Sequence, residues 1–106
     1  MANRVDIPIG RDYAISRERL AWLWGCSERD ARRTVADLRA TPGDDGYAIL
    51  STASYPAGYW RSDDPEEIAG FILETESRVR NTFLSLKDAR RLLRLKGIEV
   101  QRGLTD

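Results

Sequence analysis

The sequence predicts an α+β, mainly helical protein, with two short helices, a two-stranded hairpin and a long C-terminal helix. Three observations support this prediction. Residues 16–40 hold two apolar stripes with helical spacing, separated by Gly25. Residues 47–62 hold two β-prone runs on either side of a turn. Residues 63–67, DDPEE, are typical of a helix start, because Pro65 needs no amide partner and acidic side chains favour the positive end of the helix dipole.

The N-terminal arm, residues 1–15, is expected to be irregular because a proline and a glycine interrupt it. Val5, Ile7 and Ile9 alternate within it. This alternation is compatible with a short strand or with side chains that pack across the domain.

Two helices are expected at residues 17–24 and 28–40. Ser16 and Ser27 stand where an N-cap oxygen accepts a hydrogen bond from a free amide of the first turn. Gly25 can adopt the positive φ that ends the first helix. Two helices joined by such a turn form a helix-turn-helix, whose second helix enters the major groove of DNA.

The second helix carries three arginines off its apolar face, Arg29, Arg32 and Arg33. Their guanidinium groups could bind guanine edges or backbone phosphates. The amides at the start of this helix, beside Ser27, could hold a phosphate. The alternative is an exposed helix face whose arginines pair with acidic neighbours on the same helix.

The strands are expected at residues 47–51 and 58–61, so residues 47–62 form a hairpin. A hairpin that follows a helix-turn-helix is called a wing. The turn at the wing tip, residues 52–57, carries no lysine or arginine. That leaves Arg61 as the basic residue with which the wing could contact DNA.

Aromatic residues mark further candidate surfaces. Trp22 and Leu23 are adjacent large apolar residues on the first helix, so we expect either the long helix or a partner to cover them. Of Tyr59 and Trp60, one is expected to face the core and the other water. Stacking on single-stranded nucleic acid is an alternative use for the rings of Tyr55, Tyr59 and Trp60.

A long C-terminal helix is expected over residues 64–97, with Gly97 as its stop. The pattern SLKD at residues 85–88 is itself a capping pattern, at which the helix could break. Its apolar residues recur in steps of four and three, which is a heptad seam. The seam could pack on the core of the helix-turn-helix. Its second half could instead pair with a second copy of the chain through Leu86 and Leu93.

The composition restricts the chemistry. The 106 residues include 17 basic and 17 acidic side chains, no histidine and one cysteine, Cys26. Without histidine the commonest metal ligand and general base are missing, so we expect no metal site, no cofactor and no enzyme activity. A single cysteine permits no internal disulfide, and no apolar run is long enough to span a membrane. A cytoplasmic protein is expected.

The charges are unevenly distributed although they sum to zero. Residues 16–42 carry six arginines against four acidic residues, residues 63–77 carry six acidic residues and no base, and residues 78–106 carry eight bases against three acidic residues. Fifteen of the seventeen basic residues are arginine. Arginine suits phosphate and guanine recognition, and it suits protein interfaces as well.

Residues 13–80 resemble the winged helix-turn-helix domains of bacterial and phage regulators, and most nearly the biotin-repressor-type domain. The resemblance lies in LAxLxGCS followed by AxxxVxxL, in the triplet GYW at residues 58–60 and in the acidic helix start after it. It implies a single winged helix-turn-helix domain with a two-stranded wing. It also implies sequence-specific binding of double-stranded DNA by a dimeric transcriptional regulator or repressor.

One departure from that pattern concerns the N-terminus. Such domains usually have a helix before Ala14, for which residues 1–13 leave little room. We expect the long C-terminal helix to cover the same part of the core.

An alternative function is a phage-encoded winged helix that binds and inhibits a host protein, such as a defence nuclease, in an anti-CRISPR-like role. The zero net charge and the uncharged wing tip favour this alternative. The arginines of the second helix favour DNA.

Overall fold

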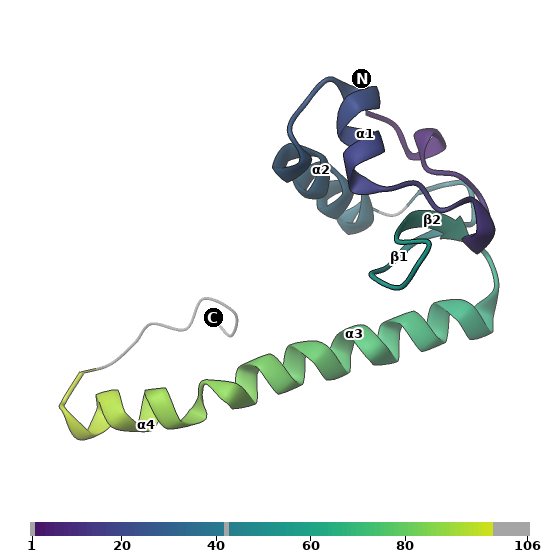
Figure 1. Ribbon diagram of the computed structural model, residues 1–106. Coiled ribbons are helices and arrows are strands. Elements are labelled where there is room, and N and C mark those ends of the chain that lie inside the picture. Colours follow the sequence, from purple (N-terminus) through teal and green to yellow (C-terminus); the bar gives the residue numbers. More distant parts are fainter. Residues whose placement is uncertain (1, 42, 99–106) are drawn as a thin grey trace. The chain divides into compact units, whose positions relative to one another are not determined.

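The computed structural model describes residues 2–41 and 43–98 and shows an α+β, mainly helical chain (Figure 1). The chain divides into two units, Met1–Phe71 and Ile72–Asp106. No helix of the described residues is long and apolar enough to cross a membrane. The elements, in order, are the 3-10 helices η1 (Arg4–Asp6) and η2 (Arg11–Tyr13), then α1 (Arg17–Trp24), α2 (Glu28–Ala40), β1 (Ala48–Thr52), β2 (Gly58–Ser62), α3 (Pro65–Ser85) and α4 (Lys87–Leu95).

The helices α1 and α2 have the predicted bounds, and local side-chain chemistry sets their ends. Ser16 Oγ accepts a hydrogen bond from the amide of Arg19 at 3.0 Å, and Ser27 Oγ accepts one from the amide of Asp30 at 3.1 Å. Gly25 ends α1 with φ 63° and ψ 39°, the left-handed conformation that glycine adopts without a steric penalty. Both serine caps and the glycine stop are confirmed.

The core lies between the helix pair, the hairpin and the N-terminal arm. Ile7 of the arm is fully buried in it, whereas Val5 and Ile9 remain exposed. No residue of Pro65–Phe71 belongs to the core cluster, so the first turns of α3 do not complete this core. The arm contributes to it, because it places one isoleucine directly against the helix pair. The buried residues of the cluster are Ile7, Leu20, Ala21, Ala31, Val35, Ile49 and Tyr59.

Backbone hydrogen bonds fix the arm along the free edge of β2. The amide of Arg61 donates to Pro8 O at 2.7 Å, and Ile15 and Tyr59 exchange two bonds, at 2.9 and 2.8 Å. A Cβ on Gly58 would collide with the carbonyl of Ile15, so this position requires glycine. The arm thereby satisfies backbone groups that an open sheet edge would leave unpaired.

The hairpin is antiparallel, with Leu50 opposite Trp60 and Ser51 opposite Tyr59, and both of its faces are buried. Tyr59 faces the core. Trp60 lies on the opposite face, where the Arg11 guanidinium stands 5.0 Å from the ring centroid and the indole N–H donates to Glu67 Oε1 at 3.0 Å. The expectation that one of the two rings faces water was therefore wrong.

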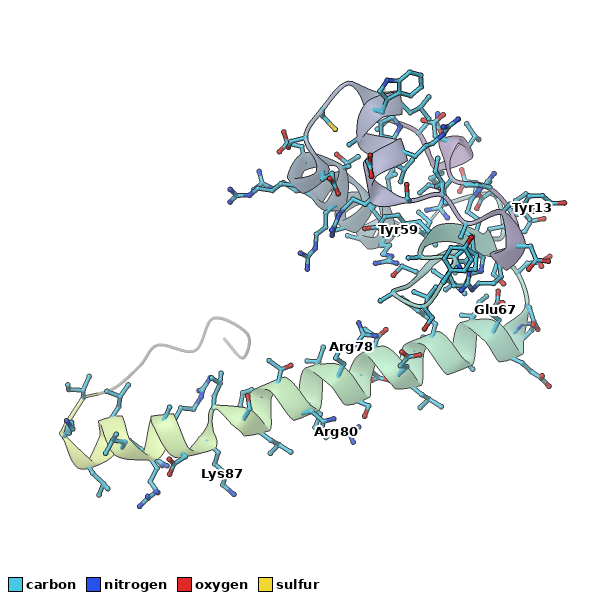
Figure 2. The ribbon with its side chains drawn as sticks, in the orientation of Figure 1. Tyr13, Tyr59, Glu67, Arg78, Arg80 and Lys87 are labelled. Atoms are coloured by element: carbon cyan, nitrogen blue, oxygen red, sulfur yellow. The ribbon has the colours of Figure 1, made fainter. Side chains whose placement is uncertain are left out.

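The start of α3 agrees with the prediction from the acidic run. Asp64 Oδ1 accepts a hydrogen bond from the amide of Glu66 at 3.2 Å, and Asp64 O accepts one from the amide of Ile68 at 3.0 Å. Hydrogen bonds from Ser62 and Trp60 lower the pKa of Glu67, so this carboxylate stays ionised while it joins the hairpin to the first turns of α3. Figure 2 shows Glu67 on these turns.

The long helix is interrupted at Leu86, inside the segment where the sequence allowed a break. The hydroxyl of Ser85 donates to Thr82 O at 2.6 Å, which is the carbonyl that the amide of Leu86 would use in an unbroken α-helix. The amide of Leu86 bonds to Phe83 O instead, at 3.2 Å. Leu86, and not Ser85, takes the N-cap position of α4.

The predicted stop at Gly97 is confirmed. Its φ is 76°, its amide donates to Arg94 O at 3.0 Å, and the amide of Ile98 donates to Leu93 O at 3.0 Å. These two bonds form a Schellman motif, which satisfies carbonyls at the C-terminal end of α4.

Candidate nucleic-acid interface

The outer face of α2 presents the three predicted arginines together. Arg29, Arg32 and Arg33 are all exposed. Successive residues of an α-helix are about 100° apart, so Arg29 and Arg33 share the face opposite Ala31 and Val35, and Arg32 stands beside them. Since Ala31 and Val35 are buried, packing of the apolar stripe forces this basic face outward.

Neighbouring acidic residues do not neutralise this basic face. None of the three arginines forms an ion pair within residues 2–41 and 43–98. Glu28, which the sequence offered as a partner on the same helix, lies 3.4 Å from Nε of Arg17 on α1 instead. The helical spacing places Asp30 and Asp37 on the flank beside Arg33 and away from Arg32, and neither forms an ion pair with Arg33 among the described residues. The basic face therefore keeps its donors for an external partner.

The start of α2 contributes Ser27. Its side chain is exposed, and its Oγ already accepts the amide hydrogen of Asp30. Ser27 thus caps the helix, while the hydroxyl hydrogen remains able to donate to a phosphate oxygen.

Arg61, the predicted basic contact of the hairpin, is an interior residue, and this expectation was wrong. Its guanidinium donates through Nε to Ile7 O at 2.7 Å and through Nη1 to Asp45 Oδ2 at 2.9 Å. Only 8% of the residue is exposed. The side chain points to the core face of the hairpin because Arg61 stands opposite Ile49 in the register.

A different arginine reaches the hairpin tip. Arg11 of η2 donates to Pro56 O at 2.7 Å and to Ser54 O at 3.2 Å. No local pattern in the sequence indicates this contact, because Arg11 and the tip are more than 40 residues apart. The tip, which has no basic residue of its own, thus receives a positive charge from the arm.

Arg39 lies near the end of α2 but acts within the fold. It donates through Nε to Ile49 O at 3.1 Å and through Nη2 to Ser51 Oγ at 2.8 Å. Its guanidinium also stands 5.7 Å from the ring centroid of Tyr59 and 5.3 Å from that of Phe71. Burial lowers the pKa of Arg39, and these contacts leave it a structural residue.

The predicted partner residues belong to different units. Trp22 and Leu23 on α1 are 77% and 49% exposed. Leu86 is exposed and Leu93 is half-buried, both in the second unit. Tyr55 at the hairpin tip is 96% exposed.

The donors gathered on α2 define a basic surface on a small α+β unit. Within the described residues no cluster of three potential metal ligands occurs. Comparison with family models, with curated proteins and with solved structures gave no match. The interpretation of this surface therefore depends on the chain's own residues.

Proposed function

We propose that the protein binds double-stranded DNA sequence-specifically, as a winged helix-turn-helix regulator of bacterial or phage type. In this proposal α1 and α2 are the helix-turn-helix and the hairpin is the wing. The observation that carries the proposal is the face formed by Arg29, Arg32 and Arg33, which is exposed and has no ion pair among the described residues. A helix with such a face fits the major groove, where arginine binds guanine O6 and N7 with two hydrogen bonds.

The wing would contribute through Arg11 in this proposal. Arg11 uses two donor nitrogens on the carbonyls of the tip, so its charge lies at the tip, where the residues Ser54 and Tyr55 are exposed. A phosphate near the tip would meet one cation and two hydroxyl donors. Arg61 has no part in this contact because its guanidinium is buried.

A second candidate function is binding to a protein, such as a host defence nuclease. The observation that favours it is the exposed pair of Trp22 and Leu23, because adjacent large apolar residues on a surface mark interaction sites. Tyr55 offers a further aromatic anchor. This function does not require the arginines of α2.

Fluorescence anisotropy with duplex DNA tests the first proposal. A labelled duplex from upstream of the protein's gene is titrated beside a scrambled duplex of the same composition. We expect tight binding to the native duplex alone. The Arg32→Ala/Arg33→Ala variant should bind it at least tenfold more weakly, since one bidentate base contact is worth about 1–3 kcal/mol.

The matched control is Arg80→Ala, which removes an exposed arginine from α3 and should leave the affinity unchanged. Equal binding of both duplexes, unaffected by the α2 substitutions, would contradict the proposal. Trp22→Ala, which should not affect DNA binding, would then be the first variant for mapping a protein partner.

A further inference from the structure

One set of large apolar side chains in the second unit recurs every seven residues along its helices. Ile72, Val79 and Leu86 are 49%, 58% and 44% exposed, and Leu93 continues the stripe on α4. Figure 1 shows α4 following α3 with a slight bend. Four large apolar side chains at seven-residue spacing are typical of one position of a heptad.

The other core position of the same heptads is small. Thr75, Thr82 and Ala89 alternate with the large residues in steps of three and four. In a parallel pair, each large seam residue would face its own counterpart, and each small seam residue would do the same. The layers formed by two threonines would then be poorly filled. Two antiparallel copies would set one large residue against one small residue in each layer between residues 75 and 93, which keeps the spacing of the helices constant there.

We propose that α3 and α4 pair with a second copy of the chain as an antiparallel coiled coil. In the register that fits, Leu86 packs against Thr82 of the second copy. Leu93 packs against Thr75 of the second copy, and Val79 against Ala89. The dimer axis then passes near residue 84. This pairing goes beyond DNA binding and does not depend on it.

The side chains that flank the seam agree with this register. Glu76, Phe83 and Arg90 follow one another at seven-residue spacing along one edge, and the Arg90 guanidinium stands 4.9 Å from the Phe83 ring centroid. In the antiparallel pair Phe83 meets Phe83 of the second copy, and Glu76 meets Arg90 of the second copy on both sides of the axis. The opposite ends of this edge therefore carry complementary charges.

The opposite edge adds no repulsion. It is formed by Arg78, Ser85 and Leu92, so the antiparallel register brings Arg78 near Leu92 of the second copy and Ser85 near Ser85. Figure 2 shows Arg78 and Arg80 on opposite sides of α3, which places Arg80 away from this edge.

The interruption at Leu86 counteracts the gradual rotation of the seam around the helix axis. An ideal α-helix drifts by about 20° per heptad relative to a seven-residue repeat. The tighter turn at Leu86, with its bond to Phe83 O, rotates the chain further per residue and opposes this drift. The seam residues on α3 and those on α4 therefore remain on one side.

Sedimentation equilibrium of the full chain, with charge-exchange variants, tests the pairing. We expect a dimer for the wild type. Glu76→Arg alone, or Arg90→Glu alone, places like charges opposite each other and should weaken the dimer by about three- to tenfold. The double variant Glu76→Arg/Arg90→Glu should restore it, and a mixture of the two single variants should form heterodimers.

Glu76 and Arg90 are fourteen residues apart on one chain, so restoration by the double variant cannot come from a contact within that chain. Helical content by circular dichroism confirms that each variant is folded. A monomeric wild type at tens of micromolar, or a double variant as weak as the single ones, would overturn the proposal.

Cross-linking then tests the orientation in a Cys26→Ser background. Thr75→Cys mixed with Leu93→Cys should form a disulfide-linked heterodimer under mild oxidation, and neither variant should do so alone. Self-cross-linking of Leu93→Cys is the result expected of a parallel pair and would overturn the antiparallel assignment.

Discussion

Asp45 holds the buried end of the hairpin together. Its carboxylate accepts hydrogen bonds from the Tyr47 amide at 3.1 Å and from Arg61 Nη1 at 2.9 Å, and Arg4 Nη2 lies 3.4 Å away. The Tyr47 amide, then Arg61 and Arg4, lower the pKa of Asp45 to about 2. Because Arg61 is buried, this carboxylate is the partner that makes its position tolerable.

The lowered pKa predicts how stability depends on pH. The unfolded chain takes up a proton at Asp45 near its ordinary value of 3.8, whereas the folded chain resists protonation down to about 2. The stabilisation from Asp45 is therefore complete above about pH 4 and is lost as the pH falls towards 2. Urea midpoints between pH 2 and 7 should show a steeper loss below pH 4 in the wild type than in Asp45→Asn.

Asp44→Asn is the matched control, since Asp44 is the exposed neighbour of Asp45. It should follow the wild-type profile. Identical profiles for the wild type and Asp45→Asn would show that the carboxylate does not stabilise the fold.

At the scale of residues, the sequence predicted features that depend on near neighbours. Ser16, Ser27, Asp64 and Gly97 cap helices through groups a few positions away, and all four were identified. The role of Arg61 could not be identified, because its partner Ile7 is 54 positions distant. Nothing in a local pattern distinguishes an arginine that faces water from one that donates to a buried carbonyl.

At the scale of elements, the N-terminal arm contributes one fully buried side chain and its backbone to the fold. Ile7 fills the core between the helix pair and the hairpin while the arm's backbone covers the edge of β2. Trp24 strengthens this attachment by donating its indole N–H to Asp6 at 2.8 Å. The sequence predicted the alternation in the arm, but only the tertiary packing shows which isoleucine is inside.

Two isoleucines of the arm provide a matched test of this role. Ile7→Ala should lower the free energy of unfolding by about 2–5 kcal/mol, because it removes a fully buried side chain and leaves a cavity. Ile9→Ala should cost less than about 1 kcal/mol, since Ile9 is 49% exposed. Urea unfolding followed by circular dichroism measures both, and equal costs would contradict the assignment of the arm to the core.

The helix and strand positions were predictable because their signals are periodic. The bounds of α1 and α2 agree with the prediction. The observed strands differ from the predicted ones by one residue at three of their four ends. The break at Leu86 was predictable in position but not in cause, because it depends on the rotamer that points the Ser85 hydroxyl at Thr82 O. The burial of both hairpin faces depends on Arg11 and Glu67, which lie outside the hairpin.

At the scale of the whole molecule, charge is segregated while the net charge is zero. The α2 face is positive, the start of α3 is acidic, and the later part of the chain is basic again. The fold class, α+β and mainly helical, was predicted from periodicity and turn chemistry. The partner of the α2 face stays a prediction, because exposed arginines suit phosphate, guanine and carboxylate alike.

The salt dependence of DNA affinity tests the central proposal most directly. We predict that the affinity of the wild type for duplex DNA falls steeply as salt rises from about 50 to 200 mM, as it does when arginines displace counterions from phosphates. Arg29→Ala/Arg32→Ala/Arg33→Ala should bind more weakly and show a log–log slope shallower by about 1 for each phosphate contact removed. Thermal melting confirms that this variant is folded. The same affinity and the same slope for both proteins would contradict the account.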